Sequence, residues 1–414
     1  MQLPDEFVCK TCDLMGQERF ERYLQSFDEE PPVSIRLNPK KTSDDRWQMA
    51  DKAEPVPWCR NAYYLSKRPN FTFDPLFHAG CYYVQEAASM FIDEALRQHL
   101  PSDISHLASL DMCAAPGGKS TLLRAALPQD SVLYSNEPIR NRASILLENV
   151  QKWGYEHHFV TNLYPKDYRK AKMHFDLILC DVPCSGEGMF RKDEATIKEW
   201  SPQNVEKCWQ LQREIVSDAW QCLNEGGILI YSTCTFNTKE NEENVRWMME
   251  ELGAEVLPIE TKAEWHITGS LLEGFHEPVY RFIPGITRSE GLFACVLRKG
   301  SFKSVPPLGK TCSSMGKKLF LQREKTISPM ETNQIHADVP HVELSYQQAM
   351  AYLRGEALHL PEETPRGEVE ACFMGQSLGL AKNIGTRANN LYPKPWRIKT
   401  THIPNEYEPI IKQI

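Results

Sequence analysis

The stretch that decides the fold is Asp111-Met112-Cys113-Ala114-Ala115-Pro116-Gly117-Gly118-Lys119-Ser120. A strand-like run over residues 109–113 overlaps its start, and helical patterning begins near Ser120. Small residues and two glycines between them let backbone N–H groups approach a ligand at the N-terminus of the helix. A strand, a glycine-containing loop and a helix in this order predict the start of an α/β domain with its ligand site at the loop.

Strand-like and helical segments alternate from this loop onward. The strand-like runs are residues 109–113, 132–136, 159–161, 177–180 and 228–232. Helical patterning between them is typical of βα units, which predicts a doubly wound, mainly parallel sheet over residues 106–300. One more apolar run, residues 293–297, follows Gly291 and is predicted to be a late edge strand.

The flanking regions predict two further units. Residues 1–105 combine a predicted helix over 18–27, a strand over 33–38 and a helix over 84–99, which indicates an N-terminal α+β subdomain. Residues 301–335 are polar, basic and interrupted by Pro and Gly, which is typical of a linker. Short strand-like pieces and glycine turns over residues 336–414 predict a small β-rich domain.

The composition argues against several classes of protein. Of the 414 residues, 41% are hydrophobic and 25% charged, and no apolar stretch approaches the roughly 20 residues of a membrane span. No secretory signal is visible at Met1, so we expect a cytoplasmic, monomeric protein whose 13 cysteines are reduced. Cys9 and Cys12 form one CxxC without a second pair, so no metal site is expected. The net charge of −8 argues against coating of nucleic acid, but basic clusters at 166–172 and 303–325 would suit a structured nucleic acid held locally.

Two ligand classes compete for the loop over residues 113–119. A phosphate-binding loop reads GxxxxGK[ST], and Gly118-Lys119-Ser120 fits its second half, but Cys113 stands where the first glycine is needed. A nucleoside cofactor such as S-adenosylmethionine instead needs an acidic residue at the end of the second strand to accept the ribose hydroxyls. Glu137 follows the predicted strand over 132–136 and meets this need. The combination favours the cofactor, with a nucleotidase as the alternative.

Two cysteines follow two later strands. Cys184 lies in Asp181-Val182-Pro183-Cys184-Ser185-Gly186-Glu187-Gly188, and Cys234 lies in Ser232-Thr233-Cys234-Thr235. Ligands of open α/β sheets gather at the carboxyl ends of the strands, so we expect the two thiols to face one another across one base-sized pocket. C5 of a pyrimidine attacks a methyl sulfonium only after a thiolate has added at C6, and a second group must help the adduct come apart. The pair predicts methyl transfer to carbon, and Asp181 is predicted to hydrogen-bond N3 and the amino group of cytosine.

The chain resembles the NOL1/NOP2/Sun family of RNA cytosine-5 methyltransferases, in particular its bacterial small-subunit ribosomal RNA branch. The resemblance covers most of the chain and is carried by Ser34-Ile35-Arg36-Leu37-Asn38, Val56-Pro57-Trp58, Tyr82-Tyr83-Val84-Gln85-Glu86, Cys113 to Lys119, Asp181 to Gly188, Phe190-Arg191-Lys192-Asp193, Tyr231 to Phe236 and Glu240-Asn241-Glu242. The family implies a class I, Rossmann-like methyltransferase core. It also implies Cys234 as the nucleophile on C6 and Cys184 as the residue needed to release the product.

The same resemblance implies S-adenosyl-L-methionine as the cofactor. The implied contacts are Cys113, Ala114, Ala115, Pro116, Gly117, Gly118, Lys119, the ribose acid Glu137, and Asp181. One position departs from the family pattern, which usually has an acidic residue just after the third strand, near the adenine. This chain reads Thr161-Asn162-Leu163-Tyr164, so Asn162 or Tyr164 would take the place of the acidic residue. The property that this difference would affect is the affinity for the cofactor.

Residues 336–414 resemble the PUA-like RNA-binding module of the same branch. Basic and aromatic side chains interleave there in a pattern suited to phosphate contact and base stacking: Lys382, Arg387, Tyr392, Lys394, Trp396 and Arg397. The resemblance implies 16S ribosomal RNA as the substrate. A transfer RNA cytosine-5 methyltransferase and a non-catalytic RNA-binding factor of ribosome assembly are the alternatives.

Overall fold

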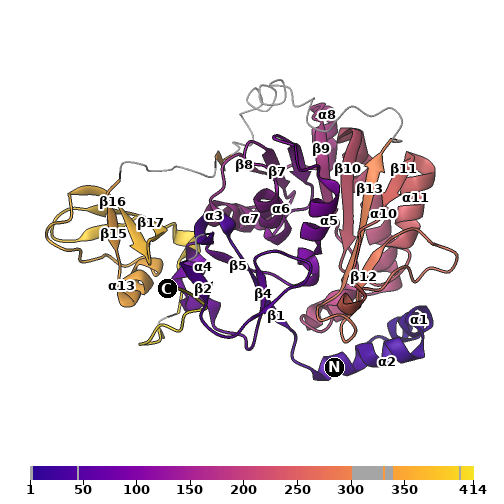
Figure 1. Cartoon of the computed structure of the whole chain (residues 1–414), viewed down its shortest axis with the longest axis horizontal. Coiled ribbons are helices and arrows are strands. Elements are labelled where there is room, and N and C mark those ends of the chain that lie inside the picture. The colour runs from indigo at the N-terminus through magenta and orange to yellow at the C-terminus, as the bar shows by residue number, and fades with distance from the viewer. Residues whose placement is uncertain (1–2, 44–45, 301–329, 332–338, 401) are drawn as a thin grey trace.

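The computed structural model describes residues 3–43, 46–300, 330–331, 339–400 and 402–414 (Figure 1). A central sheet flanked by helices forms the body of the molecule, and a small β-rich unit lies at the other end of its long axis. The predicted linker over residues 301–335 and its basic cluster lie outside the described residues, apart from the two-residue strand β14 (Met330–Glu331).

The core of the central sheet is parallel. Its five parallel strands are β6 (Ala108–Asp111), β7 (Val132–Asn136), β8 (His158–Thr161), β9 (Phe175–Asp181) and β10 (Leu223–Thr233). They lie in the order β10-β9-β6-β7-β8, so the direction of winding reverses between β6 and β9. Ligands of open α/β sheets bind at such a reversal, beyond the carboxyl ends of the strands. The predicted doubly wound α/β fold is confirmed.

Antiparallel strands extend the sheet on both sides and make it mixed. They are β13 (Leu292–Lys299) beside β10, β11 (Ala254–Leu257) and β12 (Tyr280–Phe282) beside β13, and β14 beside β8. The prediction of residues 293–297 as an edge strand is wrong, because β13 is paired along both of its edges. Every residue from Leu292 to Leu297 is buried, which explains why this run is continuously apolar.

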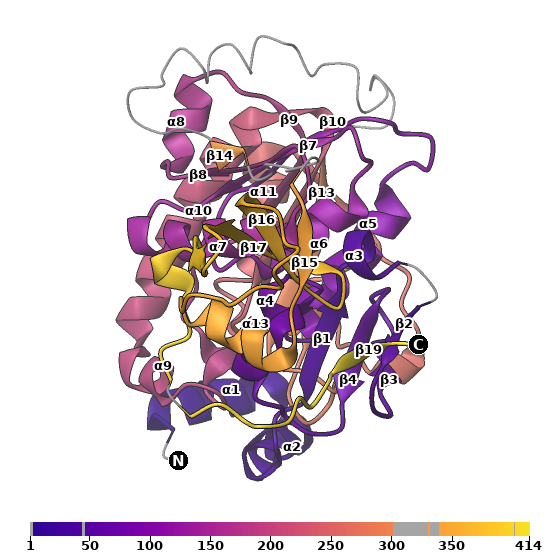
Figure 2. The same ribbon diagram turned by 90° about the vertical axis from the view of Figure 1, so that its left-hand side faces the viewer.

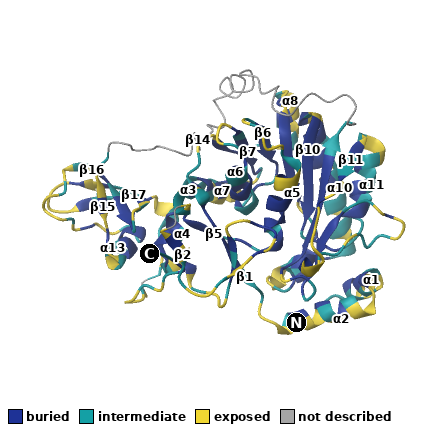
Figure 3. Cartoon of the chain, viewed as in Figure 1, coloured by how far each residue is buried: buried dark blue, intermediate teal, exposed yellow. Residues whose placement is uncertain are grey.

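Helices cover both faces of the sheet, and Figure 3 shows buried residues concentrated along the strands between them. On one face, α5 (Ile92–His99) and α6 (Gly118–Ala126) pack Leu96, Leu122 and Leu123 against apolar side chains of the strands. On the other face the packing helices are α8 (Pro165–Lys170), α10 (Pro202–Cys222) and α11 (Glu242–Leu252). The helix α7 (Arg140–Trp153) follows β7. Among the described residues, no helix combines the length and the apolar character that crossing a bilayer requires.

The N-terminal region consists of two helices and a small sheet. The helices α1 (Asp5–Met15) and α2 (Gln17–Gln25) lie below the central sheet in Figure 1. The small antiparallel sheet has the order β3-β4-β1-β5 and comprises β1 (Val33–Leu37), β3 (Glu54–Pro55), β4 (Ala62–Leu65) and β5 (Tyr82–Val84). Two single-turn helices, α3 (Pro39–Thr42) and α4 (Pro75–His78), connect these strands.

The helix predicted over residues 84–99 begins later than expected. After β5 the chain makes a 3₁₀ turn at Ala88–Phe91 before α5 starts at Ile92. The carboxylate of Glu86 accepts hydrogen bonds from the backbone N–H groups of Ala88 and Ser89, both at 3.0 Å. This side-chain cap satisfies the first backbone donors of the 3₁₀ turn. The helical segment therefore starts after Glu86, and residues 84–86 are not part of it.

The C-terminal unit is a small sheet with one helix. Its elements are β15 (His341–Glu343), α13 (Tyr346–Leu353), β16 (Gly367–Phe373), β17 (Gln376–Asn383) and β18 (Ala388–Asn390). It contacts the N-terminal region, where the Tyr407 hydroxyl donates to Asp74 at 3.0 Å. The last segment returns along that region and ends in β19 (Ile411–Gln413), which pairs with β2 (Trp47–Met49) (Figure 2).

Candidate active site

The loops after β9 and β10 bring the two predicted thiols into contact. β9 and β10 are parallel neighbours, with Asp181 opposite Ser232, so both strands end at the same edge of the sheet. The Sγ atoms of Cys184 and Cys234 are 3.2 Å apart, and the backbone N–H of Cys234 donates to the Cys184 sulfur at 3.4 Å. Both cysteines are free and half-buried. The sulfurs do not face one another across a base-sized pocket, because atoms in van der Waals contact leave no room for a ring between them.

The surroundings of Cys184 favour its protonated form. The hydrogen bond to Cys234 and burial raise the pKa of the Cys184 thiol well above its usual value, and the charge of Glu240 adds to this. A thiol at Cys184 is able to donate its S–H toward the sulfur of Cys234. Cys184 therefore lies beside Cys234 as a neutral thiol.

A buried carboxylate, Glu187, ties the two cysteine loops together. It is 2% exposed and accepts hydrogen bonds from the backbone N–H groups of Phe236 and Asn237, at 2.8 and 2.9 Å, and from the Trp200 indole at 2.9 Å. Next to it, the Gly188 N–H donates to the Cys234 carbonyl at 2.7 Å. Glu187 and Gly188, which follow Cys184, thus bind the backbone at Cys234 and at the two residues Phe236 and Asn237.

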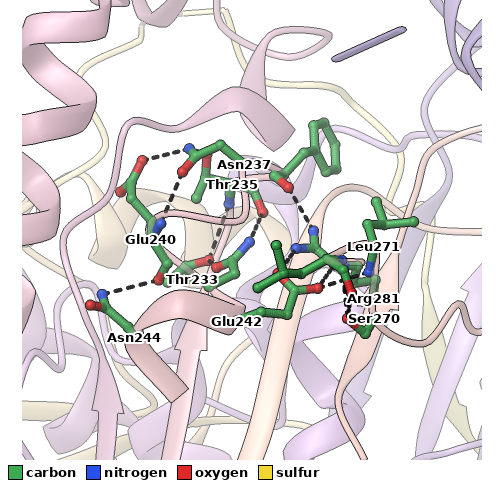
Figure 4. A network of polar contacts seen from close by, with 12 residues as sticks. Thr233, Thr235, Asn237, Glu240, Glu242, Asn244, Ser270, Leu271 and Arg281 are labelled. Carbon is green, nitrogen blue, oxygen red and sulfur yellow. Dashed lines mark hydrogen bonds and ion pairs between the residues drawn. The ribbon is translucent and has the colours of Figure 1, made fainter. Parts of the chain in front are cut away.

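Figure 4 shows Glu240, a second buried acid, beside Asn237, and Glu240 also links the Cys234 loop back to the Cys184 loop. It follows Cys234 in sequence, and its Oε2 accepts from the Ser185 N–H at 3.0 Å and from the Gln212 amide at 2.6 Å. The Asn237 amide donates to the other oxygen of Glu240 at 2.8 Å and also lies within hydrogen-bond distance of Glu187. Burial raises the pKa of Glu240. We gave Glu187 and Glu240 no role from the sequence; the signal available there was an acidic residue a few positions after each cysteine.

A buried ion pair supports the same loop from below (Figure 4). Arg281 on β12 pairs with Glu242 at the start of α11, and both side chains are at most 1% exposed. The Arg281 guanidinium also donates to the Phe236 carbonyl at 2.7 Å. The Glu242 carboxylate accepts from the Leu271 N–H at 3.0 Å. The segment after Cys234 is therefore held by charged groups that are fully shielded from water.

The loop over residues 113–119 runs from β6 into α6, as the sequence predicts. Gly117 has φ +115°, which favours glycine, and Gly118 begins the helix. Backbone contacts fix the loop: the Ala114 N–H donates to the Asn136 carbonyl at 2.8 Å, and the Asn149 amide donates to the Pro116 carbonyl at 2.8 Å. The Ala115–Pro116 peptide is cis. Burial raises the pKa of Cys113 well above its usual value, so it lies here as a neutral thiol.

Lys119 and Asp181 connect this loop to the cysteine loops. The Lys119 ammonium lies 2.9 Å from Asp181 Oδ2, and the other carboxylate oxygen accepts from the Ser232 hydroxyl at 2.7 Å. Burial lowers the pKa of Lys119, but the ion pair with Asp181 raises it more. The pKa of Lys119 is therefore above its usual value. Lys119 is thus directed at the carboxylate that ends β9.

The residues at the carboxyl ends of β6 and β7 fit a nucleoside cofactor. Glu137 follows β7, is 1% exposed, and accepts from the Ile139 N–H at 2.9 Å. Asp111 ends β6, and its Oδ1 is buried without a hydrogen-bond partner among the described residues. Burial raises the pKa of Asp111 to about 7. An unpartnered carboxylate oxygen and a strand-end glutamate beside a glycine loop form an acceptor set suited to hydroxyl and ammonium groups.

Asn162, at the position that departs from the family pattern, contacts the backbone of Glu137. The Asn162 amide donates to the Glu137 carbonyl at 2.6 Å, so it buttresses the strand end that carries Glu137. Tyr164 is 62% exposed, and Lys166 lies 5.4 Å from its ring. Of the two predicted substitutes, Asn162 is therefore the one in contact with the predicted cofactor residues.

Three segments of the chain match family models. Residues 79–298 match the model described as 16S rRNA methyltransferase RsmB/F, residues 3–87 match the N-terminal domain of 16S rRNA methyltransferase RsmF, and residues 339–398 match the methyltransferase RsmF PUA domain. The first match alone covers more than half of the chain. The chain belongs to the RsmB/F family. The resemblance drawn from its sequence motifs is confirmed.

Three curated relatives of this RsmB/F chain are each named ribosomal RNA small subunit methyltransferase F. The protein of Pectobacterium atrosepticum is 33% identical over 76% of this chain and 66% of its own length. The protein of Erwinia tasmaniensis is 27% identical over 94% of this chain and 96% of its own length. That of Aliivibrio salmonicida is 31% identical over 82% and 73%.

Solved structures show the same fold. A methyltransferase homolog protein from Pyrococcus horikoshii has a TM-score of 0.57 and 25% identity, over 72% of this chain and all of that one. NSun6 from Pyrococcus horikoshii, solved with SFG, has a TM-score of 0.58 and 19% identity, over 72% of this chain and 98% of that one. The second likeness concerns the fold alone.

The C-terminal unit of this RsmB/F member offers fewer RNA-contact groups than the sequence predicts. Tyr392 is 3% exposed and packs against Tyr352 with a centroid separation of 5.5 Å, so its prediction as a stacking residue is wrong. Trp396 is half-buried, and the Lys152 ammonium of α7 lies 5.4 Å from its ring. The remaining predicted contacts are basic, with three exposed and Arg397 half-buried: Lys382, Arg387, Lys394 and Arg397.

One group of potential metal ligands lies on the same unit. His341, Glu370 and Cys372 place ligand atoms within 4.8 Å of one another. Burial raises the pKa of Cys372 to about 12, which favours its thiol form.

Proposed function

We propose that this chain transfers a methyl group to C5 of cytosine in 16S ribosomal RNA, through a covalent bond between Cys234 and C6 of the base. The observation that carries the proposal is the contact of two sulfurs 3.2 Å apart at the carboxyl ends of β9 and β10. Membership of the RsmB/F family supports RNA as the substrate class, and the names of the curated relatives support 16S ribosomal RNA.

The two sulfurs take different roles in this proposal. The Cys234 sulfur, as thiolate, forms a bond to C6, and the electrons of the C5=C6 bond become available at C5. After C5 carries the methyl group, its proton leaves to a base, the C6–S bond breaks and the C5=C6 bond is restored. The raised pKa of the Cys184 thiol makes it the poorer nucleophile in the free protein, and the family resemblance supports Cys234 as the nucleophile and Cys184 as the residue that assists release.

Asp181 is proposed to contact both the cytosine base and the cofactor. Its carboxylate is 31% exposed, so one edge remains accessible beside the Lys119 ammonium. A carboxylate held at this place accepts a hydrogen bond from the cytosine amino group and favours protonation at N3, which stabilises the adduct. The Ser232 hydroxyl, 2.7 Å away, fixes its orientation.

S-adenosyl-L-methionine is the proposed methyl donor, and when bound it supplies an electrophilic methyl group. The residues proposed to hold it are Cys113, Ala114, Ala115, Pro116, Gly117, Gly118, Lys119, Glu137, Asn162 and Asp181. Glu137 accepts the ribose hydroxyls, and the N-terminal end of α6 provides backbone donors. Asn162 acts by holding the strand end that carries Glu137.

The proposal divides the chain into four parts. Residues 1–105 form an RNA-binding subdomain, 106–300 the methyltransferase core, 301–335 a linker, and 336–414 a PUA-like RNA-binding domain. The matches of family models to residues 3–87, 79–298 and 339–398 support this order. We expect the protein to act as a monomer in the cytoplasm and to need no metal.

The decisive test supplies methyl-labelled S-adenosylmethionine with 16S ribosomal RNA, small ribosomal subunits or transfer RNA, followed by nucleoside analysis. We expect label in 5-methylcytidine from 16S ribosomal RNA, free or in the subunit. Label in another nucleoside would refute C5 of cytosine, and label in transfer RNA alone would select that alternative substrate. Absence of both label and cofactor binding at millimolar concentration would favour the assembly-factor alternative.

A further inference from the structure

A large cavity lies between the N-terminal arm and the methyltransferase core. Its volume is about 880 Å³. Its walls come from the end of α2 and the connection to β1, from the turn after β4, from the two residues after Phe190, and from the turn over residues 285–289. No step of the proposed reaction uses this cavity.

The lining of this cavity is strongly basic. Six cationic side chains line it: Arg22, Lys67, Arg68, Arg191, Lys192 and Arg288. Only two acidic side chains, Glu29 and Glu30, do so, although the chain as a whole has a net charge of −8. A concentration of positive charge inside a hollow of an acidic protein focuses the field and attracts anionic ligands.

Two of these cations are available for a ligand. Lys67 and Arg68 are exposed and have no ion-pair partner among the described residues. Arg22 and Arg288 have carboxylate partners in exposed ion pairs, and such pairs exchange readily with other anions. Arg191 is different, because it is 5% exposed and paired with Glu290, so it serves as part of the wall.

The wall formed by Arg191 is continuous with the cysteine site. Arg191 donates to the Ser26 carbonyl of the N-terminal arm at 3.0 Å and to both oxygens of Glu290. The next residue after Glu290, Gly291, donates to the Gly188 carbonyl at 3.4 Å, and Gly188 donates to the Cys234 carbonyl at 2.7 Å. One unbroken set of contacts therefore links the basic cavity to the backbone of the cysteine.

We infer that this cavity binds backbone phosphates of the single-stranded RNA next to the target cytosine. The inference rests on the proposed function, because it assumes that RNA reaches Cys234. Phosphates suit the cavity since single strands are held by positively charged grooves that follow the backbone. The competing occupant, an acidic segment of a ribosomal protein, has the same charge but no reason to lie beside a cytosine-binding site.

The test neutralises the two unpaired cations in Lys67→Gln/Arg68→Gln. We expect the Kd for a fluorescent oligocytidylate and for 16S ribosomal RNA to rise roughly tenfold at physiological salt. The slope of log Kd against log salt should fall by about 1.4, since each phosphate contact in a single strand contributes about 0.7. The kcat and the affinity for S-adenosylmethionine should not change, because neither residue belongs to the proposed reaction site.

The matched control is Arg60→Gln/Lys262→Gln, which removes the same charges from side chains that are each 69% exposed and lie outside the cavity. Equal salt slopes for the two double variants would overturn the inference. So would a loss of affinity for polyglutamate without a loss for RNA. Failure of the proposed function looks different: the wild-type protein would make no 5-methylcytidine while the Lys67/Arg68 variant still lost RNA affinity.

Discussion

The sulfur atoms of Cys184 and Cys234, fifty positions apart in the chain, lie 3.2 Å from one another. This contact exists because β9 and β10 are adjacent parallel strands and end in register at the same edge of the sheet. Under the proposed mechanism, two sulfurs in contact would approach a base from the same side, and the Cys184 sulfur would lie beside the sulfur that bonds to C6. Because the two sulfurs have different proposed roles, substitution of Cys184 and substitution of Cys234 should give different results.

The first prediction concerns the two cysteines. Cys234→Ala should abolish turnover, because it removes the proposed nucleophile on C6. Cys184→Ala should accumulate an RNA–protein adduct that survives a denaturing gel, because bond formation is intact and release is not. The reverse pattern would exchange the two roles, and normal turnover in both variants would remove the covalent mechanism.

The second prediction concerns Glu187, a positioning residue. Glu187→Gln replaces one acceptor oxygen by an amide donor, which cannot accept from both the Trp200 indole and the backbone N–H groups of the Cys234 loop. We expect kcat to fall about 100-fold with little change in the KM for RNA, as displacement of a reacting group by about 1 Å does. The control is Glu199→Gln, an exposed residue of the neighbouring helix α9 (Glu194–Glu199). A change in KM alone would contradict a positioning role.

The third prediction tests the close approach at Gly188. A Cβ atom there would lie 2.6 Å from the Cys234 carbonyl oxygen and 2.7 Å from the Gly291 Cα, and both neighbours are backbone. Gly188→Ala should therefore displace the Cys234 loop and lower methyl transfer at least 100-fold while the protein stays folded by circular dichroism. Gly269→Ala has open space around the new methyl group and should be fully active.

The fourth prediction concerns the buried ion pair between Arg281 and Glu242. Arg281→Met leaves a fully buried carboxylate without its partner, which should lower the free energy of unfolding by about 3–5 kcal/mol in urea titrations. Lys262→Met removes one partner of an exposed pair with Glu264 and should cost about 0–1 kcal/mol. Equal effects of the two substitutions would show that water reaches the Arg281 site.

The fifth prediction is a dependence of stability on pH. Burial raises the folded-state pKa of Asp111 to about 7, whereas an unfolded aspartate titrates near 3.9. Between these values the folded state binds the proton more tightly, so Asp111 lowers stability as the pH rises from about 4 to about 7. Asp111→Asn should flatten this part of the curve of unfolding free energy against pH. An unchanged slope would mean that Asp111 is ionised in the folded protein at lower pH.

Much of the fold could be read from local patterns. Apolar runs of strand length alternating with helical patterning located β6 to β10, and the glycines at 117 and 118 marked the turn into α6. β13 was misplaced at an edge because a single apolar run does not tell which neighbours a strand has. The start of α5 was missed because the carboxylate of Glu86 caps the segment, a contact that periodicity does not register.

The sequence by itself determined the chemistry available to this protein: two cysteines, an aspartate and a glycine loop, each just past a buried strand. That much follows because residue type and strand periodicity are local properties. Only the tertiary structure decided that the sulfurs touch, that Cys184 keeps its proton, and that Glu187 and Glu240 join the two loops. It also decided that Tyr392 is buried and that six cations from four distant segments share one cavity. Distances and burial between segments far apart in the chain arise from packing, and a linear pattern carries no record of them.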